Sequence, residues 1–228
     1  MIKIFHLQKM TLQDFPNKVA CIVFLSGCNF RCNFCHNPAT VAGDKENISE
    51  QEFFDFLDSR KGKLDGVVIS GGEPTIYGEK LITFMQKIKA RDFAIKLDTN
   101  GSNPVFLKKM YKLNLLNYVA MDIKCPFEKY GKVTSAKNVI QKIKDSIKLI
   151  IGSKIDYEFR TTAYPGLDLA DFKEMFSYVK GCKRYIIQKY APDVTLDLQK
   201  PLVIYGKDTL NKIKDTIGSE NGAIFVRD

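Results

Sequence analysis

Short apolar segments alternate along the chain with longer segments in which apolar residues recur every three or four positions. The short segments have the length and β-branched content of buried strands, and the longer ones have the periodicity of amphipathic helices. Six strands are expected, at residues 19–25, 66–70, 93–99, 118–124, 155–162 and 184–190. Helices are expected at residues 49–62, 77–92, 103–114, 136–150, 168–181 and 207–218, and a last apolar segment covers residues 222–227.

The regular alternation of strand and helix predicts a parallel sheet covered by helices. Ser49 marks the start of the first helix, because Glu52 lies three residues later and completes a capping box. No linker-like segment interrupts the pattern, so residues 1–228 are expected to form a single domain. Six strand–helix units are fewer than the eight of a closed barrel, which leaves an incomplete barrel or an open doubly wound sheet.

The composition is that of a globular protein, with 45% hydrophobic and 27% charged residues. No apolar segment approaches the roughly 20 residues that cross a bilayer, and the N-terminal segment lacks the apolar core of a signal peptide. We therefore expect a cytoplasmic protein without a membrane partner. The net charge of +9 comes from lysines spread over the predicted helices, as on solvated helix faces. No nucleic-acid-binding motif accompanies them, so nucleic acid is not the expected partner.

The unusual residues follow the C-terminal ends of the predicted strands. The segments are "SGCNFRCNFCHN", "SGGEPT", "LDTNG", "MDIKC", "RTTAYPG" and "QKYAP". In parallel α/β proteins, the loops after the strands gather at one rim and form the binding or catalytic site. The sequence therefore predicts a functional site at this rim.

Three of the six cysteines, Cys28, Cys32 and Cys35, lie within eight positions with C-x3-C-x2-C spacing. In a reducing compartment, such a group indicates metal binding or redox chemistry more often than disulfides. Three thiolates would leave one iron of an iron–sulfur cluster open for chemistry, whereas an electron carrier normally uses four cysteines. Two alternatives stay open at this point: a structural zinc site completed by His36, or a group of free thiols.

The other rim segments also have structural explanations. The turn at residues 71–74 can bring backbone close to a ligand and leave its amides and carbonyls free to bind, but it is also a common turn composition. Asp98 could cap the helix that follows it. Asp122 and Lys124 lie two positions apart and therefore point to the same side of their strand, which allows a site function or a simple ion pair.

Together, the phrases "TLQDFPNKVACIVFLSGCNFRCNFCHNP", "ISGGEPT", "LDTNG" and "MDIK" resemble the radical S-adenosylmethionine (SAM) superfamily. Within it they are most similar to glycyl-radical-enzyme activating proteins, and among these to the activators of anaerobic ribonucleotide reductase. The resemblance is specific over residues 10–124 and looser over "RTTAYPG" and "QKYAP". It implies an incomplete (β/α)6 TIM-like barrel with parallel strands and outer helices.

The resemblance also implies the cofactors. A four-iron four-sulfur (4Fe-4S) cluster would be bound by Cys28, Cys32 and Cys35, and the amino and carboxylate groups of SAM would chelate its open iron. One electron from the reduced cluster would then cleave SAM and give a 5'-deoxyadenosyl radical. The remaining cysteines lack the spacing of a second cluster, so one cluster is expected.

The residues that the resemblance places near SAM come from several rim segments. Phe34 matches an aromatic position near the adenine, and Lys124 matches a basic, catalytically important residue near the SAM carboxylate, with Arg160 as a further candidate there. Asp98 and Asp122 match acidic positions that, in some activating enzymes, help to hold a monovalent cation. The turn that meets the methionine amino group consists of Gly71, Gly72, Glu73 and Pro74.

The expected activity is hydrogen abstraction from a glycine of a partner glycyl radical enzyme, with anaerobic ribonucleotide reductase as the expected partner. A flavodoxin- or ferredoxin-type protein would supply the electron. One alternative keeps the radical chemistry but directs it at a small-molecule or nucleic-acid-related substrate. The other alternative is a zinc-stabilised binding module without catalysis.

Overall fold

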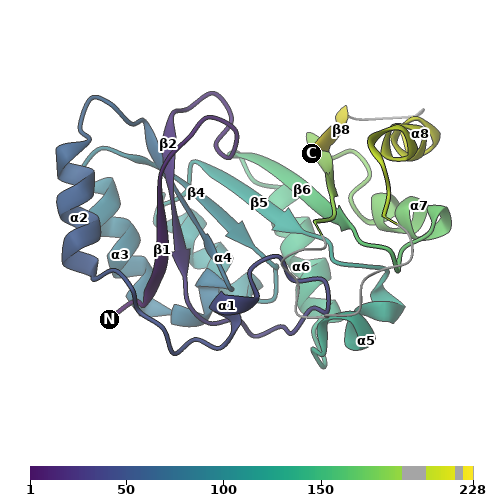
Figure 1. The fold of residues 1–228 in the computed structure, drawn as a ribbon, viewed down its shortest axis with the longest axis horizontal. Coiled ribbons are helices and arrows are strands. Elements are labelled where there is room, and N and C mark those ends of the chain that lie inside the picture. Colours follow the sequence, from purple (N-terminus) through teal and green to yellow (C-terminus); the bar gives the residue numbers. More distant parts are fainter. Residues whose placement is uncertain (192–203, 219–222, 228) are drawn as a thin grey trace. The chain divides into compact units, whose positions relative to one another are not determined.

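The computed structural model describes residues 1–191, 204–218 and 223–227. It contains two compact units that are interleaved along the sequence. Figure 1 shows the ribbon of the chain with its elements labelled. Unit 1 comprises residues 1–29, 39–99 and 103–119, and unit 2 comprises residues 30–38, 100–102 and 120–228. Each unit is described by itself, and the single domain expected from the sequence stays a prediction.

The strands of unit 1 confirm three of the predicted strands and add one. Strand β1 is antiparallel to β2, and β2, β3 and β4 are parallel neighbours. The bounds are β1 Ile4–Thr11, β2 Ala20–Leu25, β3 Gly66–Gly71 and β4 Ala94–Thr99. Strand β1 was not predicted, because only its first and last residues are buried and its middle residues give no apolar segment.

Helices α2 (Glu50–Ser59) and α3 (Glu79–Lys89) lie side by side in unit 1 (Figure 1). Their buried faces meet through aromatic rings, with the centroids of Phe53 and Phe84 5.1 Å apart. The capping box predicted at Ser49 and Glu52 is confirmed by both of its hydrogen bonds. Unit 1 also contains the 3-10 helix η1 (Pro74–Tyr77) and helix α4 (Pro104–Lys112). The short helix α1 covers Pro38–Val41.

Unit 2 contains the C-terminal strands. Strand β5 (Tyr118–Asp122) begins in unit 1 and ends in unit 2. It is followed by β6 (Asp156–Ala163), β7 (Arg184–Lys189) and β8 (Ala223–Arg227), of which β6 and β8 both pair in parallel with β7. Strand β8 corresponds to the last apolar segment of the sequence, so the described residues form eight strands and not only the six that were expected.

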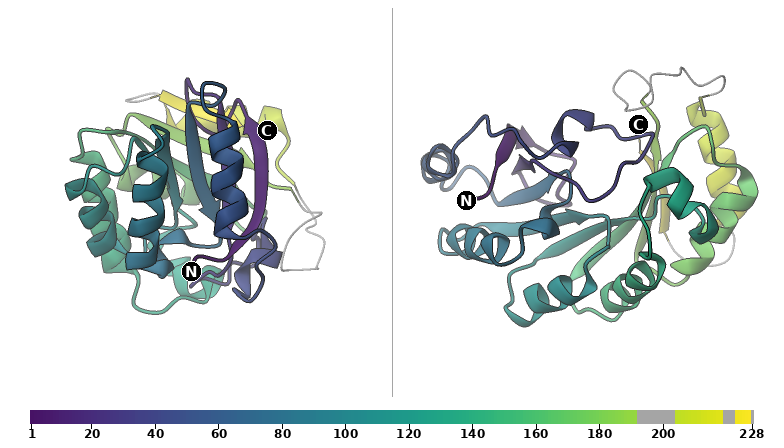
Figure 2. Two further views of the ribbon diagram at one scale, coloured as in Figure 1. Left: turned by 90° about the vertical axis from the view of Figure 1, so that its left-hand side faces the viewer. Right: turned by 90° about the horizontal axis from the view of Figure 1, so that it is seen from below.

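The helices of unit 2 follow its strands. Helices α7 and α8 lie next to each other (Figure 2), and the rings of Phe172 and Tyr205 meet there in an edge-on contact. The bounds are η2 Phe127–Lys129, α5 Tyr130–Thr134, α6 Ile140–Ile151, α7 Leu169–Tyr178 and α8 Lys207–Ile217. Among the described residues, none of these helices or those of unit 1 has the length and apolar character needed to cross a membrane.

The sheet order decides between the two fold classes that the sequence left open. The strands follow one another in chain order from β1 to β8. A doubly wound sheet instead reverses its strand order at a switch point. The chain therefore has the parallel-strand arrangement of a partial TIM-like barrel, as expected from the resemblance.

Candidate functional site

The end of β3 in unit 1 is packed directly against the end of β2. Gly71 has a φ of 117°, and a Cβ on Gly72 would lie 1.9 Å from the carbonyl oxygen of Gly27. The Gly72 N–H donates to the Leu25 carbonyl (2.9 Å), and the Glu73 N–H donates to the Gly27 carbonyl (2.8 Å). The prediction that the amides of this turn are free for a ligand is therefore wrong for these two, because the neighbouring strand end occupies them. Only glycine permits this close approach.

Glu73 is fully buried and connects the ends of β3 and β4. Its Oε1 accepts hydrogen bonds from the Thr75 N–H (3.1 Å), the Thr75 hydroxyl (2.6 Å) and the Thr99 hydroxyl (2.8 Å). Pro74 is the first residue of η1, a position that proline often occupies in helices. The Glu73 side chain therefore fixes the turn from inside unit 1.

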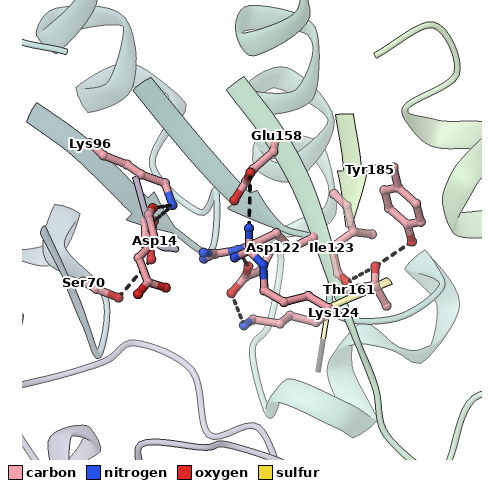
Figure 3. A network of polar contacts seen from close by, with 12 residues as sticks. Asp14, Ser70, Lys96, Asp122, Ile123, Lys124, Glu158, Thr161 and Tyr185 are labelled. Atoms are coloured by element: carbon pink, nitrogen blue, oxygen red, sulfur yellow. Dashed lines mark hydrogen bonds and ion pairs between the residues drawn. The ribbon is translucent and has the colours of Figure 1, made fainter. Parts of the chain in front are cut away.

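Asp98 lies near the end of β4 and contacts two side chains of unit 1. Its Oδ1 is 3.3 Å from Lys96 Nζ, and its Oδ2 accepts a hydrogen bond from the Ser70 hydroxyl at 3.2 Å. Lys96 and Ser70 are labelled in Figure 3. The next helix is capped by Asn103, whose side chain accepts from the Phe106 N–H. Asp98 is thus an ion-pair residue of the rim and not the helix cap that the sequence also allowed.

The cysteine loop is divided between the two units. Cys28 belongs to unit 1, where its N–H donates to the Val41 carbonyl at 3.4 Å, whereas Cys32 and Cys35 belong to unit 2. The Cys35 N–H donates to the Cys32 carbonyl at 3.1 Å and closes a turn. Each of the six cysteines is a free thiol. Among the described residues, no three His, Cys, Asp or Glu side chains surround a single metal position. A cluster does not require that arrangement, because its thiolates bind different irons.

The loop in unit 2 is anchored to α5 through its backbone. The Arg31 N–H donates to the Thr134 carbonyl at 2.8 Å, and the Asn33 N–H donates to the Val133 carbonyl at 3.3 Å. His36, which the sequence allowed as a zinc ligand, instead accepts a hydrogen bond on Nε2 from the Ala191 N–H at 3.2 Å. These contacts hold both flanks of Cys32 and Cys35 in place.

Tyr164 is a site residue that the sequence analysis did not single out, although its segment was noted at the rim. Its ring stacks on that of Phe34 with a centroid distance of 4.3 Å and an interplanar angle of 8°. A Cβ on Gly166 would lie 2.4 Å from Tyr164 Cε2, so a residue without a side chain is needed there. The stack therefore holds the ring of Phe34, which lies between Cys32 and Cys35 in the sequence, in one orientation.

We expect Tyr164→Ala to loosen this loop. Loss of the buried ring should lower the free energy of unfolding by about 3 kcal/mol, of which the stacking itself contributes about 1 kcal/mol. Tyr164→Phe keeps the ring and should retain most of that stability. Urea unfolding measures the stability. The iron retained after gel filtration of reconstituted protein reports whether the cysteine loop stays ordered enough to bind iron. Wild-type iron retention in Tyr164→Ala would contradict a role for the stack in ordering the loop.

The charged part of the unit 2 site is centred on Asp122. Lys124 Nζ donates to its Oδ2 at 2.8 Å (Figure 3), and Arg160 Nε donates to its Oδ1 at 2.7 Å. Burial opposes the charge of Asp122, but Arg160 and Lys124 outweigh it and hold the pKa of this carboxyl well below its usual range. Burial likewise opposes the charge of Lys124, but Asp122 and Cys32 raise the pKa of its ammonium. The predicted same-side placement of Asp122 and Lys124 is confirmed.

Lys124 also acts electrostatically on the cysteine loop. Burial raises the pKa of the Cys32 thiol to about 11, with Cys35 and Asp122 adding to the effect, whereas Lys124 and the Cys32 backbone hydrogen bond oppose it. Iron binding requires the thiolate, so the positive charge of Lys124 favours the ligating form. The backbone N–H of Lys124 donates to the Tyr130 hydroxyl at 3.1 Å, which fixes the start of the loop after β5.

Similarity to known proteins extends well beyond the cysteine loop. Residues 22–179 match the Radical SAM superfamily. A "Putative glycyl-radical enzyme activating enzyme" of Methanocaldococcus jannaschii is 34% identical over 189 residues, which cover 81% of this chain and 78% of that protein. The pyruvate formate-lyase-activating enzyme of Listeria monocytogenes is 33% identical over 150 residues, 60% of this chain and 59% of that enzyme.

A relative with another activity matches about as well as the Listeria enzyme. The 7-carboxy-7-deazaguanine synthase of Koribacter versatilis is 31% identical over 144 residues, which cover 62% of this chain and 60% of the synthase. Among solved structures, that of anSMEcpe with bound AdoMet has a TM-score of 0.57 at 17% identity and covers 88% of this chain and 61% of anSMEcpe. At that identity the likeness supports the fold alone. The family match and the Methanocaldococcus relative together show that this chain is a member of the Radical SAM superfamily, with glycyl-radical enzyme activating enzymes among its relatives.

Proposed function

We propose that this protein is a glycyl-radical-enzyme activating enzyme. The observation that carries the proposal is the similarity to the Methanocaldococcus relative, which extends over four fifths of the chain. The match to the Listeria enzyme supports an activating function, because the name of that enzyme states that it activates another enzyme, pyruvate formate-lyase. We further propose anaerobic ribonucleotide reductase as the partner, on the sequence phrases alone, and a flavodoxin or ferredoxin in the cytoplasm as the electron donor.

The cysteine loop has the properties that a 4Fe-4S cluster needs. Its cysteines, Cys28, Cys32 and Cys35, are free thiols within eight positions, and Lys124 offers a positive charge to Cys32. We propose that these three thiolates bind the cluster. When bound, the cluster supplies one electron to SAM, and cleavage of SAM gives methionine and a 5'-deoxyadenosyl radical.

The residues proposed for SAM binding divide into two groups. In unit 1, the rigid turn at Gly71, Gly72, Glu73 and Pro74 would present its backbone to the methionine amino group. In unit 2, Lys124 would face the SAM carboxylate, because a buried ammonium is a strong partner for an anion that has lost its water. Arg160 would act indirectly, since its Nε is engaged by Asp122.

Phe34 would contact the adenine while Tyr164 supports its other face. The stacked pair is built entirely from unit 2, and Phe34 itself is only 5% exposed. A flat aromatic surface held in one orientation suits an adenine ring, and it excludes water from the cofactor's neighbourhood. In the final step, a hydrogen atom would pass from the glycine Cα of the partner to the 5'-deoxyadenosyl radical, which forms 5'-deoxyadenosine and leaves the unpaired electron on that glycine.

A second candidate function is radical chemistry on a small-molecule or nucleic-acid-related substrate. The similarity to the Koribacter 7-carboxy-7-deazaguanine synthase favours it, at an identity close to that of the Listeria enzyme. The zinc-stabilised binding module is not proposed, because the family match covers residues 22–179 and not only the cysteine loop.

The test uses anaerobically reconstituted protein with SAM, dithionite and a purified anaerobic ribonucleotide reductase. The proposed function predicts 5'-deoxyadenosine together with a glycyl radical signal on the reductase in electron paramagnetic resonance spectra. A reductase whose radical-site glycine is replaced by alanine is the matched control and should give no such signal. Cleavage of SAM without a radical on this reductase or on pyruvate formate-lyase would overturn the proposal and favour the second candidate.

A further inference from the structure

Lys96 is a fully buried lysine in β4, two residues before Asp98. A buried ammonium is costly unless its N–H donors have partners. In unit 1, Lys96 Nζ donates to the Asp14 backbone carbonyl (Figure 3). It also pairs with Asp98 Oδ1 at 3.3 Å and lies 5.5 Å from the centroid of the Tyr118 ring. A carbonyl, a carboxylate and an aromatic face therefore fix this positive charge beneath Asp98.

The Asp14 carbonyl is itself held in place by a local turn. The Thr11 hydroxyl donates to Asp14 Oδ2 at 2.5 Å and accepts hydrogen bonds from the N–H groups of Gln13 (3.2 Å) and Asp14 (3.3 Å). This turn is the start of the phrase "TLQDFPNK", for which the proposed function gives no role. Its position indicates that it serves to anchor Lys96.

Within unit 1, Asp98 Oδ2 accepts a hydrogen bond from Ser70, and Asp98 Oδ1 faces Lys96 Nζ at 3.3 Å as an ion pair without a hydrogen bond. Independently, both oxygens of Asp122 are occupied by groups of unit 2, Lys124 and Arg160. These are the two carboxylates that the family resemblance assigned to a possible monovalent cation. Each already has a positively charged partner within its own unit.

The charges argue against an additional cation at either carboxylate. In unit 1, Asp98 pairs with Lys96, and in unit 2, Asp122 pairs with Lys124 and Arg160. A sodium or potassium ion at either carboxylate would have to displace an ammonium or guanidinium group of the same unit. The arrangement observed in each unit thus does not fit a metal cation.

We propose that Lys96 takes the place of a monovalent metal cation at Asp98, so that this protein binds SAM without sodium or potassium. The inference rests on the proposed function, because it concerns the SAM site of that enzyme. It differs from the expectation, drawn from the family resemblance, that Asp98 and Asp122 help to hold a cation. Lys96 is then a positioning residue, which keeps Asp98 charged and oriented.

The first test compares SAM binding to the reconstituted wild-type protein in sodium chloride, potassium chloride and choline chloride at equal ionic strength. Isothermal titration calorimetry reports the dissociation constant without turnover. We expect the three values to agree within about twofold. Affinity at least about tenfold weaker in choline chloride than in either metal salt would overturn the inference.

The second test asks whether removal of the ammonium creates a need for a cation. Lys96→Met keeps the length of the side chain and removes its charge, so SAM should bind more weakly in choline chloride and recover in part with sodium or potassium. Lys96→Met combined with Asp98→Asn removes both charges and should lose that cation response. Lys183→Met, at an exposed ion pair of unit 2, is the neutral control.

The outcomes separate this inference from the proposed function. If SAM does not bind to the wild-type protein in any of the three salts, the proposed SAM site is wrong, and the inference about Lys96 is wrong as well. If SAM binds only with sodium or potassium, the inference alone is wrong. If Lys96→Met does not fold, the salt comparison on the wild-type protein still decides, since it requires no substitution.

Discussion

Cys32→Ala is expected to abolish cluster assembly. Reconstituted wild-type protein should contain about four irons per chain, and the variant should contain almost none and lose the visible absorption of the cluster. Cys32 lies between the other two proposed ligands in the sequence, and the remaining two thiols offer too few ligands to hold four irons. Iron and sulfide analysis with the visible spectrum measures the effect, and far-UV circular dichroism confirms that the variant is folded.

Cys182→Ala provides the matched control for this substitution. Cys32 and Cys182 are both buried in unit 2, and burial raises the pKa of each thiol to about 11. Cys182 lies outside the cysteine loop and should be replaceable without loss of iron. Full iron content in Cys32→Ala would contradict the ligand assignment. Equal iron loss in both variants would indicate general destabilisation and would also contradict it.

The fold could be predicted from the local pattern of apolar and polar residues wherever one or both faces of a strand or helix are buried. Strands β2 to β7 and the main helices after them lie close to their predicted positions. Strand β1 was not predicted because it is an edge strand whose middle residues are exposed. Its sequence therefore lacks the continuous apolar segment that the buried parallel strands have. An edge strand is defined by its partner, which the local sequence does not contain.

The site could be predicted where a motif is local and could not where its contacts are distant. The spacing of Asp122 and Lys124 predicted their common side, and the structure confirms it with an ion pair. Arg160 joins them from β6, 38 residues beyond Asp122. Lys96 resembles any other lysine in the sequence, because the carbonyl that receives it lies 82 residues away. The burial of the Lys96 charge therefore could not be predicted from the local sequence, because it depends on how the strands are assembled.

Asp122→Ala is expected to destabilise the protein by about 3 kcal/mol. The substitution leaves Lys124 and Arg160 as neighbouring positive charges without the carboxylate that binds both. We choose the lower end of the range for buried pairs, because the Asp122 side chain is still 24% exposed. Urea unfolding monitored by circular dichroism gives the free energy of unfolding. If the dependence of this free energy on urea concentration is unchanged, wild type and variant undergo the same unfolding transition.

Asp156→Ala isolates the effect of burial in this second case. The Lys183–Asp156 and Lys124–Asp122 pairs both have an N–O distance of 2.8 Å, but the side chains of Lys183 and Asp156 are 50% and 71% exposed. Water screens the exposed pair, so its loss should cost less than about 1 kcal/mol. If the two substitutions cost the same, Asp122 is not the centre of a buried charge network. In that case its ion pairs would no longer argue against a cation at Asp122, and that part of the case for a cation-free SAM site would be lost.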